Sequence, residues 1–226
     1  MRYRSKITLS SARALAYDSG MKTITLVTQK GGSGKSSLLA SLAVAAQEAG
    51  ERVFILDLDR QGTLAHWISR RTADTPGFDR VNTEAQLDSA LATLSEQKFT
   101  LVFIDTAGTD SPLVTAAIRA ADLCLVPARP TPADLEATQP TLEAIQATRR
   151  RFAFILNQTP VRSVRLNEAA AGLKMLGVLA EPPISQRNDH QDAIGAGQGV
   201  TEFNPRGKAA EEISALWRWI KTKLKG

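Results

Sequence analysis

Five short apolar runs recur along the chain, and each is continuous rather than alternating with polar residues. Continuous runs are typical of parallel strands covered on both faces, whereas half-exposed strands alternate. The gaps between the runs are long enough for a helix each time, which predicts a doubly wound, mostly parallel α/β sheet. The predicted strands are residues 24–28, 53–57, 101–105, 123–127 and 152–157.

Helical spacing of apolar residues predicts the elements between these strands. Residues 36–49, for example, place Leu38, Leu42, Ala46 and Ala49 on one face of a helix. Thr131 followed by Pro132 and Asp134 is typical of a helix start, with an N-cap, a first-turn proline and an early acidic residue. The predicted helices are 36–49, 63–70, 84–96, 111–120, 133–149 and 209–223, and residues 76–80 and 181–183 are predicted as loops.

The length of 226 residues indicates one well-buried domain, which we expect at 21–226, preceded by a basic N-terminal extension at 1–20. Cys124 is the only cysteine, so neither a disulfide framework nor a metal cluster held by the cysteines of one chain is possible. No run of 18 apolar residues and no signal-like start occur in the sequence. We therefore expect a cytoplasmic protein.

The charge is unevenly distributed along the chain. The formal net charge is +5, yet residues 1–20 carry +3 and residues 206–226 carry +4, which leaves the stretch between them slightly acidic. Basic ends on an acidic body favour a polyanionic partner, either DNA or an anionic membrane surface. Solvated helix ends explain the same pattern without a partner, so charge alone leaves both interpretations open.

A glycine-rich loop follows the first apolar run directly. Its glycines, Gly31, Gly32 and Gly34, let backbone N–H groups turn inward on a phosphate chain, while the helix that follows directs its positive end at the same point. Lys35 then supplies a charge for the phosphates and Ser36 a hydroxyl for Mg²⁺. The alternative is a flexible loop without a ligand, which the combination of three glycines, two lysines and a buried strand disfavours. Residues 29–37 read QKGGSGKSS.

The loop departs from the common phosphate-loop pattern, because Gln29 stands where that pattern has glycine. The form present, K-G-G-x-G-K-S with Lys30 at the front, resembles the deviant Walker A box of the ParA/MinD ATPase family. The resemblance implies a P-loop fold that binds ATP and Mg²⁺, and a homodimer in which Lys30 acts on the partner's ATP. The implied nucleotide-binding residues are Lys30, Gly31, Gly32, Ser33, Gly34, Lys35, Ser36, Ser37 and Asn157, although Asn157 equally fits a turn cap.

Three carboxylates stand where predicted strands end, at Asp57, Asp59 and Asp105. Ligands of open α/β sheets bind at the carboxyl ends of the strands, and carboxylates after buried strands are costly without a cation. We therefore predict a Mg²⁺ site from Ser36, Asp57 and Asp105, although Asp57 also fits a capping or loop carboxylate. Resemblance to the D-x-D-P-Q segment of ParA proteins assigns Asp59 the leading role in hydrolysis beside Lys30 and Lys35. Arg60 replaces the usual proline of that segment.

The C-terminal part carries the predicted DNA contacts. Arg187, Arg206 and Lys208 lie in segments that resemble those bearing DNA-facing residues in ParA proteins, although each also fits an ordinary surface position. The resemblance implies an ATPase that binds DNA without sequence preference, associates with the nucleoid when ATP-bound and is released by hydrolysis. It partitions a plasmid or other cargo with a ParB-like or other adaptor protein.

A MinD-like positioning ATPase is the main alternative, in which the amphipathic C-terminal helix lies on a membrane. We favour packing of that helix into the core, and do not expect a membrane partner. An iron-protein-like reductase would need two cysteines per chain for its bridging cluster. A bacterial tyrosine kinase would usually carry a terminal tyrosine cluster, and only Tyr3 and Tyr17 occur here.

Overall fold

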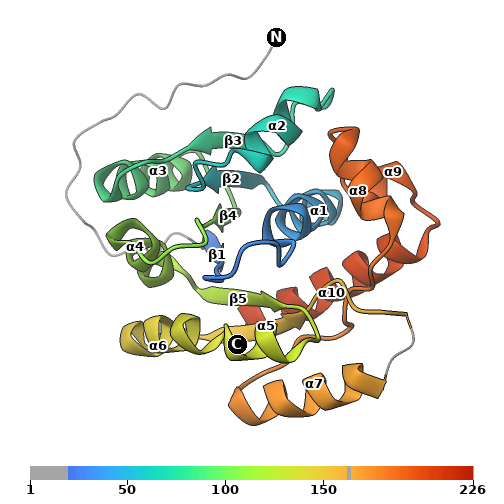
Figure 1. The fold of residues 1–226 in the computed structure, drawn as a ribbon. Helices are drawn as coiled ribbons and strands as arrows, with labels where there is room; N and C mark the ends of the chain where they lie inside the picture. Colours follow the sequence, from blue (N-terminus) through green and yellow to red (C-terminus); the bar gives the residue numbers. More distant parts are fainter. Residues whose placement is uncertain (1–19, 162–163, 226) are drawn as a thin grey trace.

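The residues described by this computed structural model, 20–161 and 164–225, build a six-stranded parallel sheet with helices on both faces (Figure 1). The strand order is β3-β2-β4-β1-β5-β6, and every neighbouring pair is parallel. The predicted doubly wound fold is therefore confirmed. The strands are β1 Lys22–Leu26, β2 Val53–Asp57, β3 Gly77–Arg80, β4 Leu101–Asp105, β5 Leu123–Ala128 and β6 Phe152–Leu156.

Ten helices connect and cover these strands within the described residues. They are α1 Lys35–Glu48, α2 Thr63–Arg70, α3 Glu84–Glu96, α4 Pro112–Ala120, α5 Pro132–Glu136, α6 Gln139–Thr148, α7 Val164–Leu176, α8 Asn188–Gly195, α9 Val200–Phe203 and α10 Lys208–Leu224.

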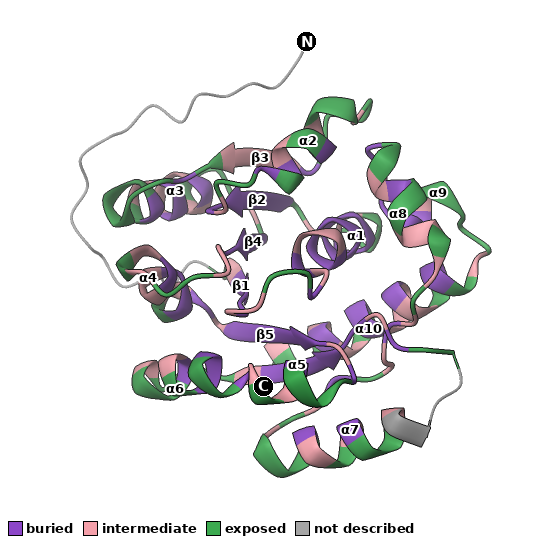
Figure 2. Cartoon of the chain, in the orientation of Figure 1, coloured by how far each residue is buried: buried purple, intermediate pink, exposed green. Residues whose placement is uncertain are grey.

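Apolar side chains of the central strands are buried between two helical layers (Figure 2). One face of the sheet packs on α1 and α10, with α2, α8 and α9 beside them, and the other packs on α3, α4, α6 and α7. Each large apolar side chain fully buried in this way contributes about 1.5–3 kcal/mol to the transfer free energy. The layers thereby fix the carboxyl ends of the strands, where the chemistry predicted from sequence lies.

Helix α10 contributes its apolar face to this core. Ile213, Leu216, Trp217 and Ile220 are buried, and Leu224 packs against the same cluster. The prediction that the C-terminal helix completes the domain is confirmed. No helix in the described part of the chain is long and apolar enough to cross a membrane.

Short polar signals set the starts of several helices. Thr83, Ser111 and Thr131 each accept a hydrogen bond from a backbone N–H three residues later, and Pro112 and Pro132 occupy the first turns of α4 and α5. Such N-caps are worth about 1 kcal/mol each. The helix start predicted at Thr131 is confirmed.

Two predicted elements are wrong. Residues 76–80 are not a loop throughout, because Gly77–Arg80 form the edge strand β3, which pairs with β2 and is only partly buried, so it needs no apolar run. The single helix predicted over 133–149 is broken into α5 and α6. Pro140 has no N–H to donate to the carbonyl of Glu136, which ends a continuous helix there.

Helices α7, α8 and α9 were not predicted, whereas residues 181–183 lie outside helices and strands as expected. The N-terminal extension predicted at 1–20 falls almost wholly on residues 1–19, which lie outside the described residues.

Candidate nucleotide-binding site

The glycine-rich loop leaves the end of β1, which lies between β4 and β5 at the centre of the sheet. The chain crosses to opposite sides of β1 from this point, so a crevice opens beyond its carboxyl end. Gly34 precedes α1 with φ of 77° in the left-handed region. A Cβ there would lie 2.6 Å from Asn157 Nδ2 and 2.7 Å from Gln158 Nε2. The left-handed conformation thus favours glycine, and a Cβ would in addition displace these two side-chain amides.

Lys35 and Ser36, the first residues of α1, both contact Asp105 at the end of β4. Lys35 Nζ lies 2.8 Å from Asp105 Oδ1 and also donates to the Thr106 carbonyl, and Ser36 Oγ donates to Asp105 Oδ2 at 2.6 Å. Burial raises the pKa of Asp105, and the Lys35 ammonium opposes that shift. The lysine is therefore held at the loop beside its carboxylate, ready for an anionic ligand.

Asp57 ends β2 directly beside Asp105, because the two residues are register partners in the parallel β2–β4 pair. Its side chain is 1% exposed, and its nearest cation, Arg80 Nε, is 3.9 Å away. Burial, before other causes, raises the pKa of Asp57 to about 6. Asp57 Oδ2 has no hydrogen-bond partner among the described residues. This buried oxygen is the kind of group that a cation would satisfy.

The predicted Mg²⁺ ligands fit that ion chemically. No group of three or more His, Cys, Asp or Glu side chains in the described residues could hold a metal alone. Mg²⁺ commonly binds through one or two carboxylates, with phosphate and water oxygens completing its shell. Asp105, Asp57 and the Ser36 hydroxyl supply such a partial set at one edge of the sheet.

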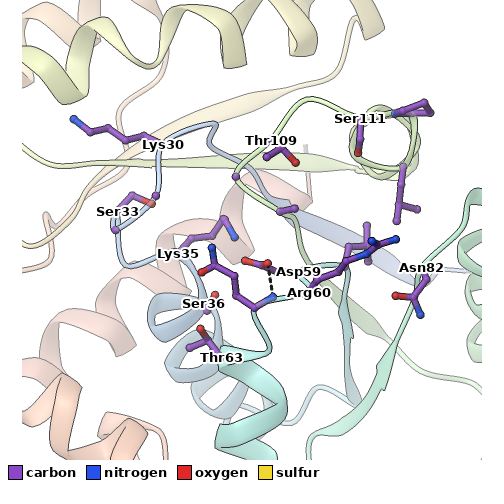
Figure 3. A pocket seen from close by; sticks show the side chains of 18 of the residues that line it. Lys30, Ser33, Lys35, Ser36, Asp59, Arg60, Thr63, Asn82, Thr109 and Ser111 are labelled. Atoms are coloured by element: carbon purple, nitrogen blue, oxygen red, sulfur yellow. Dashed lines mark hydrogen bonds between the residues drawn. The ribbon is translucent and has the colours of Figure 1, made fainter.

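Asp59 lies in the loop that joins β2 to α2, on the rim of a cleft (Figure 3). Its N–H donates to Asp57 Oδ1 at 2.9 Å, and its own Oδ1 accepts from the Gln61 N–H at 2.9 Å. These two bonds tie the loop to the end of β2 and turn it toward α2. Arg60 lines the same cleft and is exposed.

The cleft itself has a volume of about 1200 Å³, comparable to the larger small-molecule sites of proteins. All predicted loop residues from Lys30 to Ser37 line it, together with Asp59. Sequence reasoning missed the opposite wall, which comes from the starts of α3 and α4, where the N-caps Thr83 and Ser111 are located. The rule that ligands meet strand ends, applied to the cap after the predicted strand 101–105, would have found Ser111. It would not have found Thr83, because the strand before it, β3, was predicted as a loop. That wall consists of Asn82, Thr83, Glu84, Ala85, Thr109, Ser111, Pro112 and Leu113.

Lys30 sits at the front of the loop and points away from Lys35 (Figure 3). Its Nζ lies 3.3 Å from Asp134 Oδ2, at the start of α5. Burial alone would raise the pKa of Asp134, but hydrogen bonds from Thr131, Arg129 and Lys30 outweigh it and lower that pKa. Asp134 was predicted only as an early helix residue, because its pairing with Lys30 depends on tertiary structure.

The remaining predicted site residues lie outside the cleft lining. Asn157, at the end of β6, is buried and donates to the Ser33 carbonyl at 2.7 Å, so it supports the loop. Arg187 is held by Glu212 at 2.7 Å, and Lys208 pairs with Glu211 at 2.8 Å. Arg206 is exposed and has no ion pair within the described residues. Contact of these three basic residues with DNA stays a prediction.

Comparison with known proteins finds relatives that match most of this chain. A "Maintenance of carboxysome distribution protein A" from Gloeobacter kilaueensis is 31% identical over 90% of this chain and 94% of its own length. "Protein ParA" from Rhizobium radiobacter is 28% identical over 74% of this chain and 79% of its own length. A solved complex of a Cyanothece McdA variant with ATP has a TM-score of 0.75 at 17% identity, covering 91% of this chain and 97% of that one.

The family match covers most of the chain and spans the loop, the strand-end carboxylates and the cleft. Residues 24–200 match the "CobQ/CobB/MinD/ParA nucleotide binding domain". The resemblance to the ParA/MinD family drawn from the loop is therefore confirmed, and the chain belongs to the CobQ/CobB/MinD/ParA family of nucleotide-binding domains.

Proposed function

We propose that this chain is a ParA-type ATPase that dimerises on binding ATP. The dimer binds DNA without sequence preference and dissociates from it after hydrolysis. It would position a cargo through an adaptor protein. The cargo would be a plasmid or a particle such as the carboxysome, which appears in the name of one relative. The observation that carries the proposal is the pair of lysines around one glycine loop, with Lys35 directed at Asp105 and Lys30 directed away from it, toward Asp134.

The chemistry of the cleft supports phosphoryl transfer. Its transition state spreads charge over the γ-phosphate oxygens, so catalysis depends mainly on positioning and on nearby cations. Lys35 and the loop N–H groups bind and orient the phosphates, and Asp59 orients the attacking water. Asp105, Asp57 and Ser36 would hold Mg²⁺, which would neutralise phosphate charge.

Lys30 supports the dimeric part of the proposal. Its side chain lines the rim of the cleft and is 30% exposed, and among the described residues its ammonium pairs with Asp134. A second copy meeting this rim would receive the Lys30 charge at its own nucleotide. ATP thereby acts as the link between two chains, and its hydrolysis separates them.

The first test is the loss of nucleotide binding in Lys35→Ala. A charge-assisted bond to phosphate is worth about 1.5–3 kcal/mol, so ATP affinity should fall about 10- to 100-fold by calorimetry. Lys174→Ala, on exposed α7, is the control. Because Asp105 loses its partner, thermal melting must show that the variant is folded. Unchanged ATP affinity in a folded variant contradicts the assignment of the loop.

Asp59→Ala separates binding from hydrolysis. The variant should still form dimers with ATP, as followed by light scattering, while phosphate release falls about 100-fold or more. Lys30→Ala should still bind ATP but should remain a monomer in light scattering. Normal phosphate release by Asp59→Ala would remove this residue from the mechanism.

A third test decides between the proposed class and a MinD-like protein. It measures binding to DNA and to anionic liposomes, each in the presence of ADP and in the presence of ATP. Retention on DNA only with ATP supports the proposal, and the buried apolar face of α10 agrees with it. ATP-dependent flotation with liposomes instead of DNA retention overturns it.

A further inference from the structure

The side of the molecule opposite the nucleotide cleft, where the amino ends of the strands lie, is strongly basic. It is formed by the turns that enter the strands, and these turns bring together side chains far apart in sequence. Lys22 opens β1, Arg52 precedes β2, Lys98 precedes β4, and three consecutive arginines precede β6. The residues contributed by these turns are Lys22, Arg52, Lys98, Arg149, Arg150 and Arg151.

Helices that run away from the cleft end at the same edge and add further basic residues. Arg119 lies in the last turn of α4, and Lys221 and Lys223 lie in the last turn of α10, followed by Lys225. The last three lysines of the basic stretch 206–226 noted in the sequence therefore lie at this edge.

Side-chain contacts join the parts of this surface. Arg151 donates to the Lys223 carbonyl, which joins the arginine turn to α10. Lys221 Nζ lies 2.8 Å from Glu51, beside Arg52, and Arg52 Nη1 donates to the Lys98 carbonyl at 3.1 Å. The turns before the strands and the helix ends therefore form one surface. We call this surface, made of the six basic residues of the turns and Arg119, Lys221, Lys223 and Lys225, the basic edge.

Acidic residues offset little of this charge. Glu48 and Glu96 end α1 and α3, Glu51 pairs with Lys221, and Asp122 pairs with Lys22 at 3.3 Å. Ten basic residues against these four give the basic edge a formal charge of +6, more than the +5 of the whole chain. Residues 1–19 and 162–163, outside the described part of the chain, carry +4 of that total, so the described residues carry +1 and those away from the basic edge carry −5. The field of the described part is therefore directed toward one side.

Several of these cations are exposed and available. Arg149, Arg150, Lys223 and Lys225 are exposed and have no ion-pair partner in the part of the chain described. Basic groups in a last helical turn also complement the helix dipole, which accounts for Arg119, Lys221 and Lys223. It does not account for Arg150 and Arg151, which lie beyond Arg149, the C-cap of α6.

We propose that the basic edge, rather than the segment around Arg206 and Lys208, is the main surface that binds the phosphate backbone of double-stranded DNA. The inference rests on the proposed function and deepens it by naming the surface. Two copies that meet at their cleft rims leave both basic edges facing outward, so dimerisation does not cover them. Contacts to phosphates alone give binding without sequence preference.

The test compares three double variants that each remove two positive charges. Arg150→Gln with Lys225→Gln alters the basic edge, Arg206→Gln with Lys208→Gln alters the C-terminal segment, and Arg70→Gln with Lys174→Gln is the control on exposed helix surfaces. Each full-length chain is titrated with ATP into a labelled duplex at several salt concentrations. ATP-dependent dimerisation and melting are measured alongside to show that each variant is intact.

We expect the basic-edge variant to bind DNA more weakly and to reduce the slope of log K against log salt by about 2, one for each lost contact. The other two variants should keep the wild-type slope. A loss confined to the Arg206 and Lys208 variant, or an equal loss in all three, overturns the basic edge but leaves DNA binding standing. Absence of ATP-dependent DNA binding in the wild type overturns the proposed function as well, so the two failures are distinguishable.

Discussion

At the scale of single residues, Asp57 is a buried carboxylate whose surroundings compensate its charge poorly. It is almost completely buried, its Oδ2 has no hydrogen-bond partner among the described residues, and Arg80 is 3.9 Å away. A structural carboxylate would be expected to have its oxygens satisfied. A buried carboxylate with a raised pKa at the end of a strand is instead typical of a functional site.

Replacing this carboxylate with a neutral amide should therefore stabilise the fold. The pKa of Asp57 is about 6 in the folded chain against an ordinary value of 3.8, so the folded state holds its proton longer and stability falls as pH rises between these values. Asp57→Asn keeps an oxygen for the Asp59 N–H and should gain about 1–3 kcal/mol at pH 8 in urea unfolding. The gain should shrink as pH falls from 6 to 4.

The exposed Asp74 provides a control, since Asp74→Asn should change stability by less than about 0.5 kcal/mol at either pH. Destabilisation by Asp57→Asn at pH 8 would show instead that Asp57 has a structural role.

At the scale of elements, periodicity predicted the central strands and the longer helices, because these segments bury apolar residues on every strand face or on one helix face. Residues 84–96 are helical as predicted, and the strand ends correctly placed Asp57 and Asp105 together. Edge strand β3 and helix α8 were missed, since a half-exposed element needs few apolar residues. The pairing of Lys30 with Asp134 joins segments about a hundred residues apart, and no local pattern encodes it.

Helix α5 restrains the loop through that pair. Asp134 is buried at the helix start and binds Lys30, Arg129 and Thr131 together. If Lys30 must reach a second chain, it has to leave Asp134 first, and a partly exposed ion pair costs up to about 1 kcal/mol to break.

Asp134→Asn should accordingly favour ATP-dependent dimers. Because each dimer releases two Lys30 side chains, the protein concentration at half-dimerisation should fall by up to about 30-fold in analytical ultracentrifugation. Glu136→Gln changes an exposed carboxylate of the same helix and should have no effect. Weaker dimerisation by Asp134→Asn, with Glu136→Gln unchanged, would mean that Asp134 assists Lys30 rather than restraining it.

At the scale of the whole molecule, the loop that carries Asp59 is connected to the C-terminal helices through α2. Trp67 Nε1 donates to the Gln198 carbonyl at 3.1 Å, and Arg71, just after α2, binds Glu202 of α9 through both Nη atoms at 2.8 and 2.7 Å. The Arg71 side chain is 4% exposed. A Cβ at Gly197 would lie 2.6 Å from the Arg70 backbone, so the two segments pack without room between them.

This connection should account for a measurable part of the stability of the whole fold. Arg71→Met leaves Glu202 without its partner, and loss of one member of a buried pair typically costs about 3–5 kcal/mol. Because Glu202 is 25% exposed, we expect a loss of about 2–3 kcal/mol in urea unfolding at pH 7.

Burial would raise the pKa of Glu202, but bonds from Arg71 and the Gly199 N–H lower it below 4.5. The pair therefore stabilises the fold above that pH, and the difference between variant and wild type should diminish as pH falls below it. Arg70→Met, at an exposed neighbouring position, should change stability by less than about 0.5 kcal/mol. An equally small effect of Arg71→Met would show that α2 and α9 are held together by apolar packing alone, and movement of the Asp59 loop could not then reach the C-terminal helices through this ion pair.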